Sequence, residues 1–156
     1  MRKALYLTLL LVAGFSCSVQ DVCDDDPQPE LQARFKTMNG GATADTTLTG
    51  LYLYGIRAGK SDSLLLDSAT TAAVALPLDP GNDFSRFVLS TEVQADTFTI
   101  FYQREFYLIS YSCGFAVRYT VEKVDAGGSM ILDTEINEAT VDYENNQNEE
   151  HLWLFF

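Results

Sequence analysis

The sequence contains little of what most catalytic sites require. Its 156 residues include a single histidine, His151, one tryptophan and three cysteines. One histidine cannot form a multi-histidine metal site, and it argues against a histidine-based catalytic triad. A zinc site of two cysteines and two histidines is impossible, and the Gly-x-Ser-x-Gly nucleophile elbow is absent. We therefore predict a protein that is not an enzyme, with no catalytic residue, no cofactor and no metal ion.

Basic residues are also scarce. The chain has 10 Lys and Arg against 22 Asp and Glu, which gives a net charge of −12. Such a surface repels the phosphates of nucleic acids and anionic lipid headgroups, so we exclude a nucleic-acid partner. We interpret the acidity first as a source of solubility, and a cationic partner or a divalent metal remains an alternative.

Long apolar runs are missing except at the N-terminus. Met1-Arg2-Lys3 is cationic, and the twelve residues Ala4–Phe15 that follow are almost all apolar. A membrane-spanning helix needs about 20 such residues, whereas this length is typical of a secretory signal peptide. Because the run leads to Cys17, we predict a lipoprotein signal over residues 1–16 and acylation of Cys17. Removing residues 1–16 changes the net charge from −12 to −14. Ordinary signal-peptidase cleavage before Cys17 is the alternative.

The cysteine count is odd, and this supports the lipoprotein interpretation. Lipidation of Cys17 leaves Cys23 and Cys113, which can form a disulfide in an oxidising compartment. The loop it closes is about 90 residues long, so its chain-entropy contribution is on the order of 4 kcal/mol. Two free buried thiols are the alternative. Residues 17–30 are acidic, contain two prolines and are interpreted as a tether.

The remaining chain alternates apolar and polar residues with a period of two, which is typical of strands. No segment after the leader shows sustained helical spacing. The predicted strands are residues 31–36, 51–56, 63–66, 73–78, 84–90, 97–102, 106–111, 115–124, 130–136, 140–143 and 152–156. Short strands separated by turn residues predict one all-β domain over residues 31–156. We expect an antiparallel β-sandwich of immunoglobulin-like architecture.

Carboxylates are plentiful, but no pair stands out as the acid and base of a hydrolase. Glu105 lies among aromatic residues, and we assign residues 103–105 to a hairpin turn. Asp24–Asp26 and residues 142–150 carry enough oxygen ligands to attract calcium, yet they lack the spacing of a calcium-binding loop. We interpret both stretches as solvated acidic loops, and His151 as a solvated residue at the end of a strand.

The aromatic residues suggest two further alternatives. If Leu51 and Leu53 point inward, Tyr52 and Tyr54 point outward and could contribute to a glycan-binding platform. The C-terminal segment Leu152–Phe156 ends on an aromatic residue, as the strands of small outer-membrane β-barrels often do. A closing strand buried against the sheet explains this segment more simply.

Several positions together resemble a known group of proteins. They are Cys17, Cys23-Asp24, Pro27, Pro29, the predicted strand 31–35, residues 96–102 and Ser112-Cys113-Gly114-Phe115. This pattern is similar to the small uncharacterised lipoproteins of Bacteroidota, which are known only as a domain of unknown function. The resemblance implies an outer-membrane lipoprotein and supplies no activity or catalytic residue.

The sequence therefore predicts an exported, non-enzymatic cell-envelope protein. It would be anchored to the outer membrane through lipid on Cys17, facing the periplasm or the cell surface. We expect it to act as a protein-interaction or accessory module. A glycan- or small-ligand-binding surface lipoprotein is the alternative, and a small β-barrel or a carboxylate-dependent hydrolase ranks below both.

Overall fold

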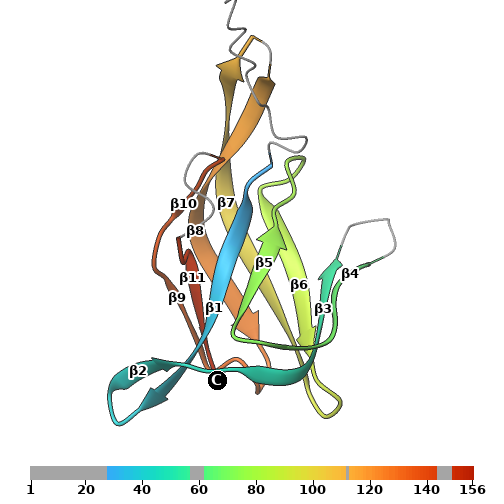
Figure 1. Ribbon diagram of the computed structural model, residues 1–156, viewed down its shortest axis with the longest axis vertical. Coiled ribbons are helices and arrows are strands. Elements are labelled where there is room, and N and C mark those ends of the chain that lie inside the picture. The colour runs from blue at the N-terminus through green and yellow to red at the C-terminus, as the bar shows by residue number, and fades with distance from the viewer. Residues whose placement is uncertain (1–27, 57–61, 112, 144–148) are drawn as a thin grey trace, which may run out of the picture.

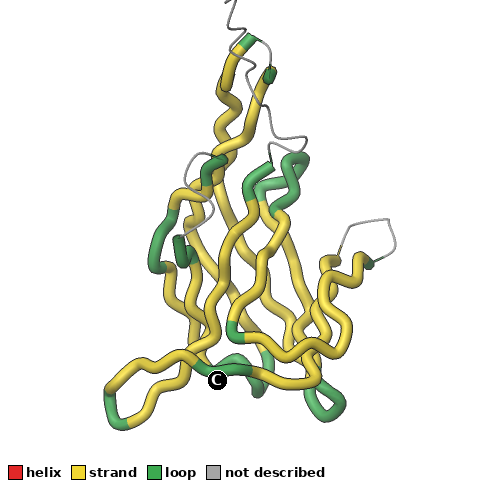
Figure 2. The backbone as a smooth tube through the Cα atoms, viewed as in Figure 1, coloured by secondary structure: helices red, strands yellow, loops and turns green. Residues whose placement is uncertain are grey.

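The computed structural model describes residues 28–56, 62–111, 113–143 and 149–156, and this part of the chain is all-β (Figures 1 and 2). No helix suited to crossing a membrane occurs in these ranges. The strands are β1 (Glu30–Asn39), β2 (Ala42–Asp45), β3 (Leu48–Ile56), β4 (Ser63–Thr71), β5 (Ala73–Pro77), β6 (Phe84–Ser90), β7 (Ala95–Ser110), β8 (Gly114–Gly127), β9 (Asp133–Ile136), β10 (Thr140–Val141) and β11 (Leu152–Phe155).

The strands form two sheets that pack face to face, which confirms the predicted β-sandwich. Sheet A has the order β2-β1-β11-β9, with β5 also paired to β1, and sheet B has the order β10-β8-β7-β6-β3-β4. The strand pairs are antiparallel except for β1 and β11, which run parallel. In Figure 1, β1, β5 and β11 lie in front of the long strands of sheet B.

The core follows the period-two pattern of the sequence. In β1, Leu31 and Phe35 are fully buried, whereas Arg34 between them is half-buried on the outer face. Burying a large apolar side chain stabilises the fold by about 1.5–3 kcal/mol. The core residues of the other strands are Leu51, Leu53, Val74, Leu76, Phe87, Leu89, Phe98, Ile100, Tyr102, Val117, Tyr119, Val121, Val141, Leu152 and Leu154.

The sequence pattern did not predict β2. Its four side chains, Ala42–Asp45, are all exposed and show no apolar alternation. The strand forms because Gly40 and Gly41 both adopt positive φ angles, 61° and 87°, which make a tight two-residue hairpin turn. Asn39 and Ala42 then pair directly across this turn.

The predicted turn at residues 103–105 is wrong, because β7 continues through it as one strand of 16 residues. These three polar residues pair with Arg118–Thr120 of β8. One of the three, Glu105, also forms a cross-strand ion pair with Arg118 at 3.5 Å. The chain reverses instead between Ser110 and Gly114, where Gly114 has a φ of 79°.

The hairpin of β7 and β8 projects beyond the rest of the sandwich, at the top of Figure 1. Pairing of β6 with β7 stops at Phe84 and Phe101, and pairing of β10 with β8 stops at Tyr119. The chain enters β1 at the same end. Glu30 pairs with Pro77, which leads through a short connection to Phe84.

Candidate functional site

Two of the three predicted site residues lie outside the part of the chain that the structure describes. They are Cys17 and Cys23, so lipidation and the disulfide stay predictions. Cys113 lies in the turn of the β7–β8 hairpin and is half-buried, and its backbone N–H donates to Ser110 Oγ at 3.0 Å. The acidic stretch Asp24–Asp26 also lies outside the described ranges.

The interpretation of His151 as a solvated residue is wrong, since only 1% of its surface is exposed. Its N–H donates to the carbonyl of Gln32 at 2.9 Å, and its Nδ1 accepts from the N–H of Gln32 at 3.0 Å. The parallel pairing of β1 and β11, which period-two patterns do not reveal, brings the two residues together. Burial lowers the pKa of His151, against weaker opposing effects of Glu149 and Glu138. It is therefore a neutral structural histidine.

A second polar cluster lies at the base of the hairpin. The buried carboxylate of Asp142 accepts hydrogen bonds from Arg118 Nε at 2.5 Å and from the Tyr107 hydroxyl at 2.7 Å. The Arg118 guanidinium lies over the Tyr107 ring, 4.9 Å from its centre. Glu105 contacts the same guanidinium from the exposed side. Asp142 and Glu105 thus both contact the Arg118 guanidinium. The Asp142 contact holds the chain that follows β10 against the hairpin.

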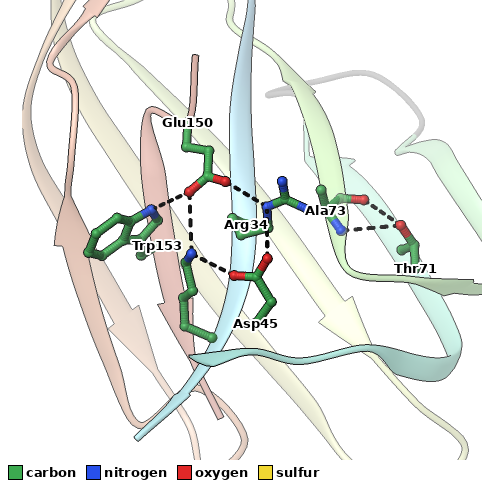
Figure 3. Close-up of polar contacts among 7 residues, drawn as sticks. Arg34, Asp45, Thr71, Ala73, Glu150 and Trp153 are labelled. Carbon is green, nitrogen blue, oxygen red and sulfur yellow. Dashed lines mark hydrogen bonds and ion pairs between the residues drawn. The ribbon is translucent and has the colours of Figure 1, made fainter. Parts of the chain in front are cut away.

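Glu150 is the centre of a cluster on the outer face of sheet A (Figure 3). It accepts hydrogen bonds from Arg34 Nε at 2.9 Å and Trp153 Nε1 at 2.8 Å, and Lys36 Nζ lies 3.3 Å away. Lys36 also pairs with Asp45 at 2.6 Å. Burial opposes ionisation of Glu150, but these donors outweigh it and lower the pKa of Glu150. Two cations balance two carboxylates, so the cluster joins β1, β2 and β11.

Asp96 is a third buried carboxylate, with 2% of its surface exposed. It accepts backbone N–H bonds from Ser129 at 3.0 Å and from Met130 and Ile131 at 2.7 Å. Burial opposes ionisation, yet the three donors lower the pKa of Asp96. The carboxylate fixes the chain that connects β8 to β9, and Gly128, at a φ of 146°, lies directly against it.

Three carboxyl groups of these clusters are held in their ionised form. Asp45, Asp96 and Glu150 each have a pKa that is lowered in the folded protein. A general acid needs the opposite shift. In the same ranges, no group of three or more His, Cys, Asp and Glu side chains is arranged to hold a metal ion.

A small cleft lies beside the connection 78–83. β3 and β5 end at this cleft, and β6 begins there. Its volume is about 250 Å³, and its walls include Ile56, Phe84 and Arg86. The polar base is rigid, because Ser85 Oγ and the Tyr102 hydroxyl, 2.8 Å apart, both bond the Asp79 backbone. Binding sites for small molecules usually enclose about 300–1,000 Å³, so this cleft is smaller than most of them.

The most unusual surface is at the end of the β7–β8 hairpin. Four apolar side chains there are largely exposed, and together we name them the hairpin tip. They are Phe106 (61% exposed), Leu108 (44%), Tyr111 (100%) and Phe115 (68%). The strand prediction did not distinguish this surface from core. One signal in the sequence nevertheless marks it, because no charged residue occurs between Glu105 and Arg118.

Residues 50–156 match a family of unknown function, DUF6452. The chain belongs to the DUF6452 family. This confirms the expected domain of unknown function, whereas its assignment to Bacteroidota lipoproteins stays a prediction. No curated protein and no solved structure matches the chain.

The DUF6452 match includes the hairpin tip, Cys113 and the buried Asp96 and His151. It begins within β3, so β1, β2 and the predicted anchor precede it. The match therefore leaves out Arg34, Lys36 and Asp45 of the Glu150 cluster, and the family description assigns no function to the residues that it includes.

Proposed function

We propose that this DUF6452 protein is a lipid-anchored, non-enzymatic module of the cell envelope that acts by binding an envelope protein. One observation carries the proposal. The chain enters β1 at the same end of the sandwich from which the β7–β8 hairpin projects (Figure 1). Lipid on Cys17 would be separated from β1 by residues 17–29, which span at most about 45 Å.

This arrangement gives the domain an orientation. The hairpin end would lie toward the membrane, and the turn between β6 and β7 would lie away from it. A disulfide between Cys23 and Cys113 would restrict the tether further, since Cys113 lies at the hairpin turn. The domain would then be held close to the membrane, with its far end available to a partner.

The chemistry of the described clusters supports binding over catalysis. Their carboxylates pair with cations or backbone donors, and the pKa shifts among them favour the ionised form that hydrolytic acids must avoid. The far end carries Val93, which is 89% exposed in the turn between β6 and β7. Singly exposed apolar residues are common on protein surfaces, so Val93 serves here as a position for a probe.

Photo-crosslinking in intact cells tests the proposal. A photoreactive residue at Val93 of the full chain should give a protein adduct of discrete mass, because the anchored far end faces its partner. The adduct should be lost when Cys17→Ala is added. The same probe at the buried Phe98 is the matched control and should give none. An adduct that is unchanged by Cys17→Ala, or adducts at neither Val93 nor Met38, another exposed far-end residue, would contradict the proposal.

The cleft supports the alternative, a glycan- or small-ligand-binding module. Its wall presents the exposed Arg86 beside Phe84, with the guanidinium 6.0 Å from the ring centre. Saturation-transfer NMR with a set of envelope oligosaccharides tests this alternative. Signals that disappear in Arg86→Ala would favour it over protein binding, and the absence of transfer would rule against it.

A further inference from the structure

The hairpin tip is a continuation of the core side of sheet B. Phe106 pairs with Val117, and Leu108 pairs with Phe115. Directly paired residues lie on the same side of a sheet, as do residues two apart in one strand. Phe106 and Leu108 therefore lie on the side that buries Tyr102 lower in the same strand. Tyr102 is 1% exposed and lies in the core, where its hydroxyl bonds the Asp79 backbone, but among the described residues none comparably covers Phe106 or Phe115.

The tip is also free of charge in an acidic chain. The twelve residues from Phe106 to Val117 contain no charged side chain, although the protein has 22 Asp and Glu. Charged residues return on both strands at the same level, where Glu105 pairs with Arg118. Aromatic residues at a boundary between an uncharged and a charged zone are typical of the membrane–water interface.

We propose that the hairpin tip inserts into the headgroup–hydrocarbon boundary of the membrane that holds the anchor. This insertion rests on the proposed function, because the direction of the membrane is taken from the lipid on Cys17. The four tip residues would be the inserted side chains. Glu105 and Arg118, at the base of the tip, would remain in water outside the bilayer.

Energetic reasons favour a membrane over other occupants. A single acyl chain gives reversible membrane binding, and further chains or a second protein contact make the attachment stable. The anchor holds the tip close to the bilayer, so even a small apolar tip binds at a high effective concentration. The acidic surface would be repelled by anionic lipids, so we expect the tip to prefer zwitterionic lipids. The tether offers the tip less apolar surface to pack against than a membrane does, since Val19 and Val22 are the only aliphatic residues between Cys17 and Pro27.

Tryptophan fluorescence in vesicles tests the insertion. The full mature lipidated protein is reconstituted in zwitterionic phospholipid vesicles as Tyr111→Trp and, as matched control, as Val93→Trp. Both side chains are almost fully exposed, so neither substitution should disturb the fold. They lie at opposite ends of β7, which extends about 50 Å if straight. The wild type, with Trp153, supplies the background.

Insertion predicts a blue-shifted emission in the Tyr111→Trp variant and a clear loss of the added intensity with brominated lipids, because an inserted side chain lies at the headgroup–acyl boundary. Bromines near the headgroups should quench more than bromines near the chain ends. The added emission of the Val93→Trp variant should not be quenched. Combining Tyr111→Trp with Phe106→Ser and Phe115→Ser should reduce the quenching.

The other outcomes separate the two proposals. Intact mass of the same preparation reports whether Cys17 is acylated. An acylated Tyr111→Trp chain without quenching would overturn insertion and leave the anchor standing. A blue shift without quenching in that variant would place the tip against protein and would also overturn insertion. A chain without acylation would contradict the proposed function, and the insertion with it.

Discussion

Leu108 and Phe115 pair directly across the β7–β8 hairpin, on the side of sheet B that forms the core elsewhere, yet they are 44% and 68% exposed. The same alternation that buries Tyr102 and Tyr119 continues into this pair without an opposing sheet. The apolar side of sheet B therefore becomes exposed at the end of the domain where the chain enters β1. This relationship underlies both the proposed orientation and the proposed membrane contact.

Substitutions at the hairpin tip should leave the stability of the fold nearly unchanged. Phe106→Ser and Phe115→Ser should each alter the free energy of unfolding by less than about 1 kcal/mol, since the rings are mostly exposed already. Phe98→Ala, in the core, should cost about 3–5 kcal/mol. Urea unfolding of the purified protein measures all three. A loss above about 2 kcal/mol at the tip would mean that these rings are packed against protein.

Asp96 should be important for stability because it is a buried carboxylate with three backbone donors. Asp96→Asn should cost about 2–3 kcal/mol, since hydrogen bonds to a buried charge are strong and the new amide would face N–H groups. Asp125→Asn is the matched control. It removes an exposed ion pair with Lys123 and should cost less than about 1 kcal/mol. Equal losses for the two variants in thermal unfolding would refute this role.

The fold should lose stability in mild acid through His151. Its pKa is lowered in the folded state from the ordinary value of 6.5, so the unfolded chain binds the proton more readily. The neutral form stabilises the fold above this value, and the contribution is lost as pH falls below it, at up to about 1.4 kcal/mol per pH unit. The pKa of Asp96 is lowered from its ordinary value of 3.8, so its contribution to stability is lost only in stronger acid.

Urea unfolding between pH 7 and pH 5 measures this dependence. The chain has no other histidine, so His151→Gln should flatten the curve even if it lowers stability at pH 7. A His151→Gln curve as steep as that of the wild type would show that another group is responsible.

A disulfide between Cys23 and Cys113 has a distinctive signature in a double-mutant series. If the two residues are paired, Cys23→Ser, Cys113→Ser and the double variant should all lose the same stability, up to about 4 kcal/mol. Mass mapping without reduction should find one peptide pair that joins them. Additive losses, or free thiols at both positions, would show that the bond does not form.

The sequence was sufficient to predict the strands whose side chains alternate most regularly. β6 occurs at Phe84–Ser90 as predicted, and Leu51 and Leu53 in β3 point inward as expected. Polar residues misled the prediction at 103–105, because pairing with Arg118 of β8 keeps Glu105 within a strand. Local patterns do not record such partners, which lie 13 residues away in the chain.

The parallel pairing of β1 with β11 was equally hidden. Two strands more than 100 residues apart carry no shared local signal, so the burial of His151 between them could not be anticipated. The hairpin tip was different. The sequence contains its uncharged run, but apolar residues in a strand are normally part of the core. The tip residues are exposed because the β7–β8 hairpin extends beyond the end of sheet A.

Both proposals depend on lipidation of Cys17, which mass spectrometry of the mature protein purified from membranes can measure. We expect a chain that begins at Cys17 and carries fatty acyl groups on that residue. Metabolic fatty-acid labelling should be abolished by Cys17→Ala and retained in Cys23→Ala. A mature chain that begins elsewhere, or labelling that persists in Cys17→Ala, would show that Cys17 is not the anchor.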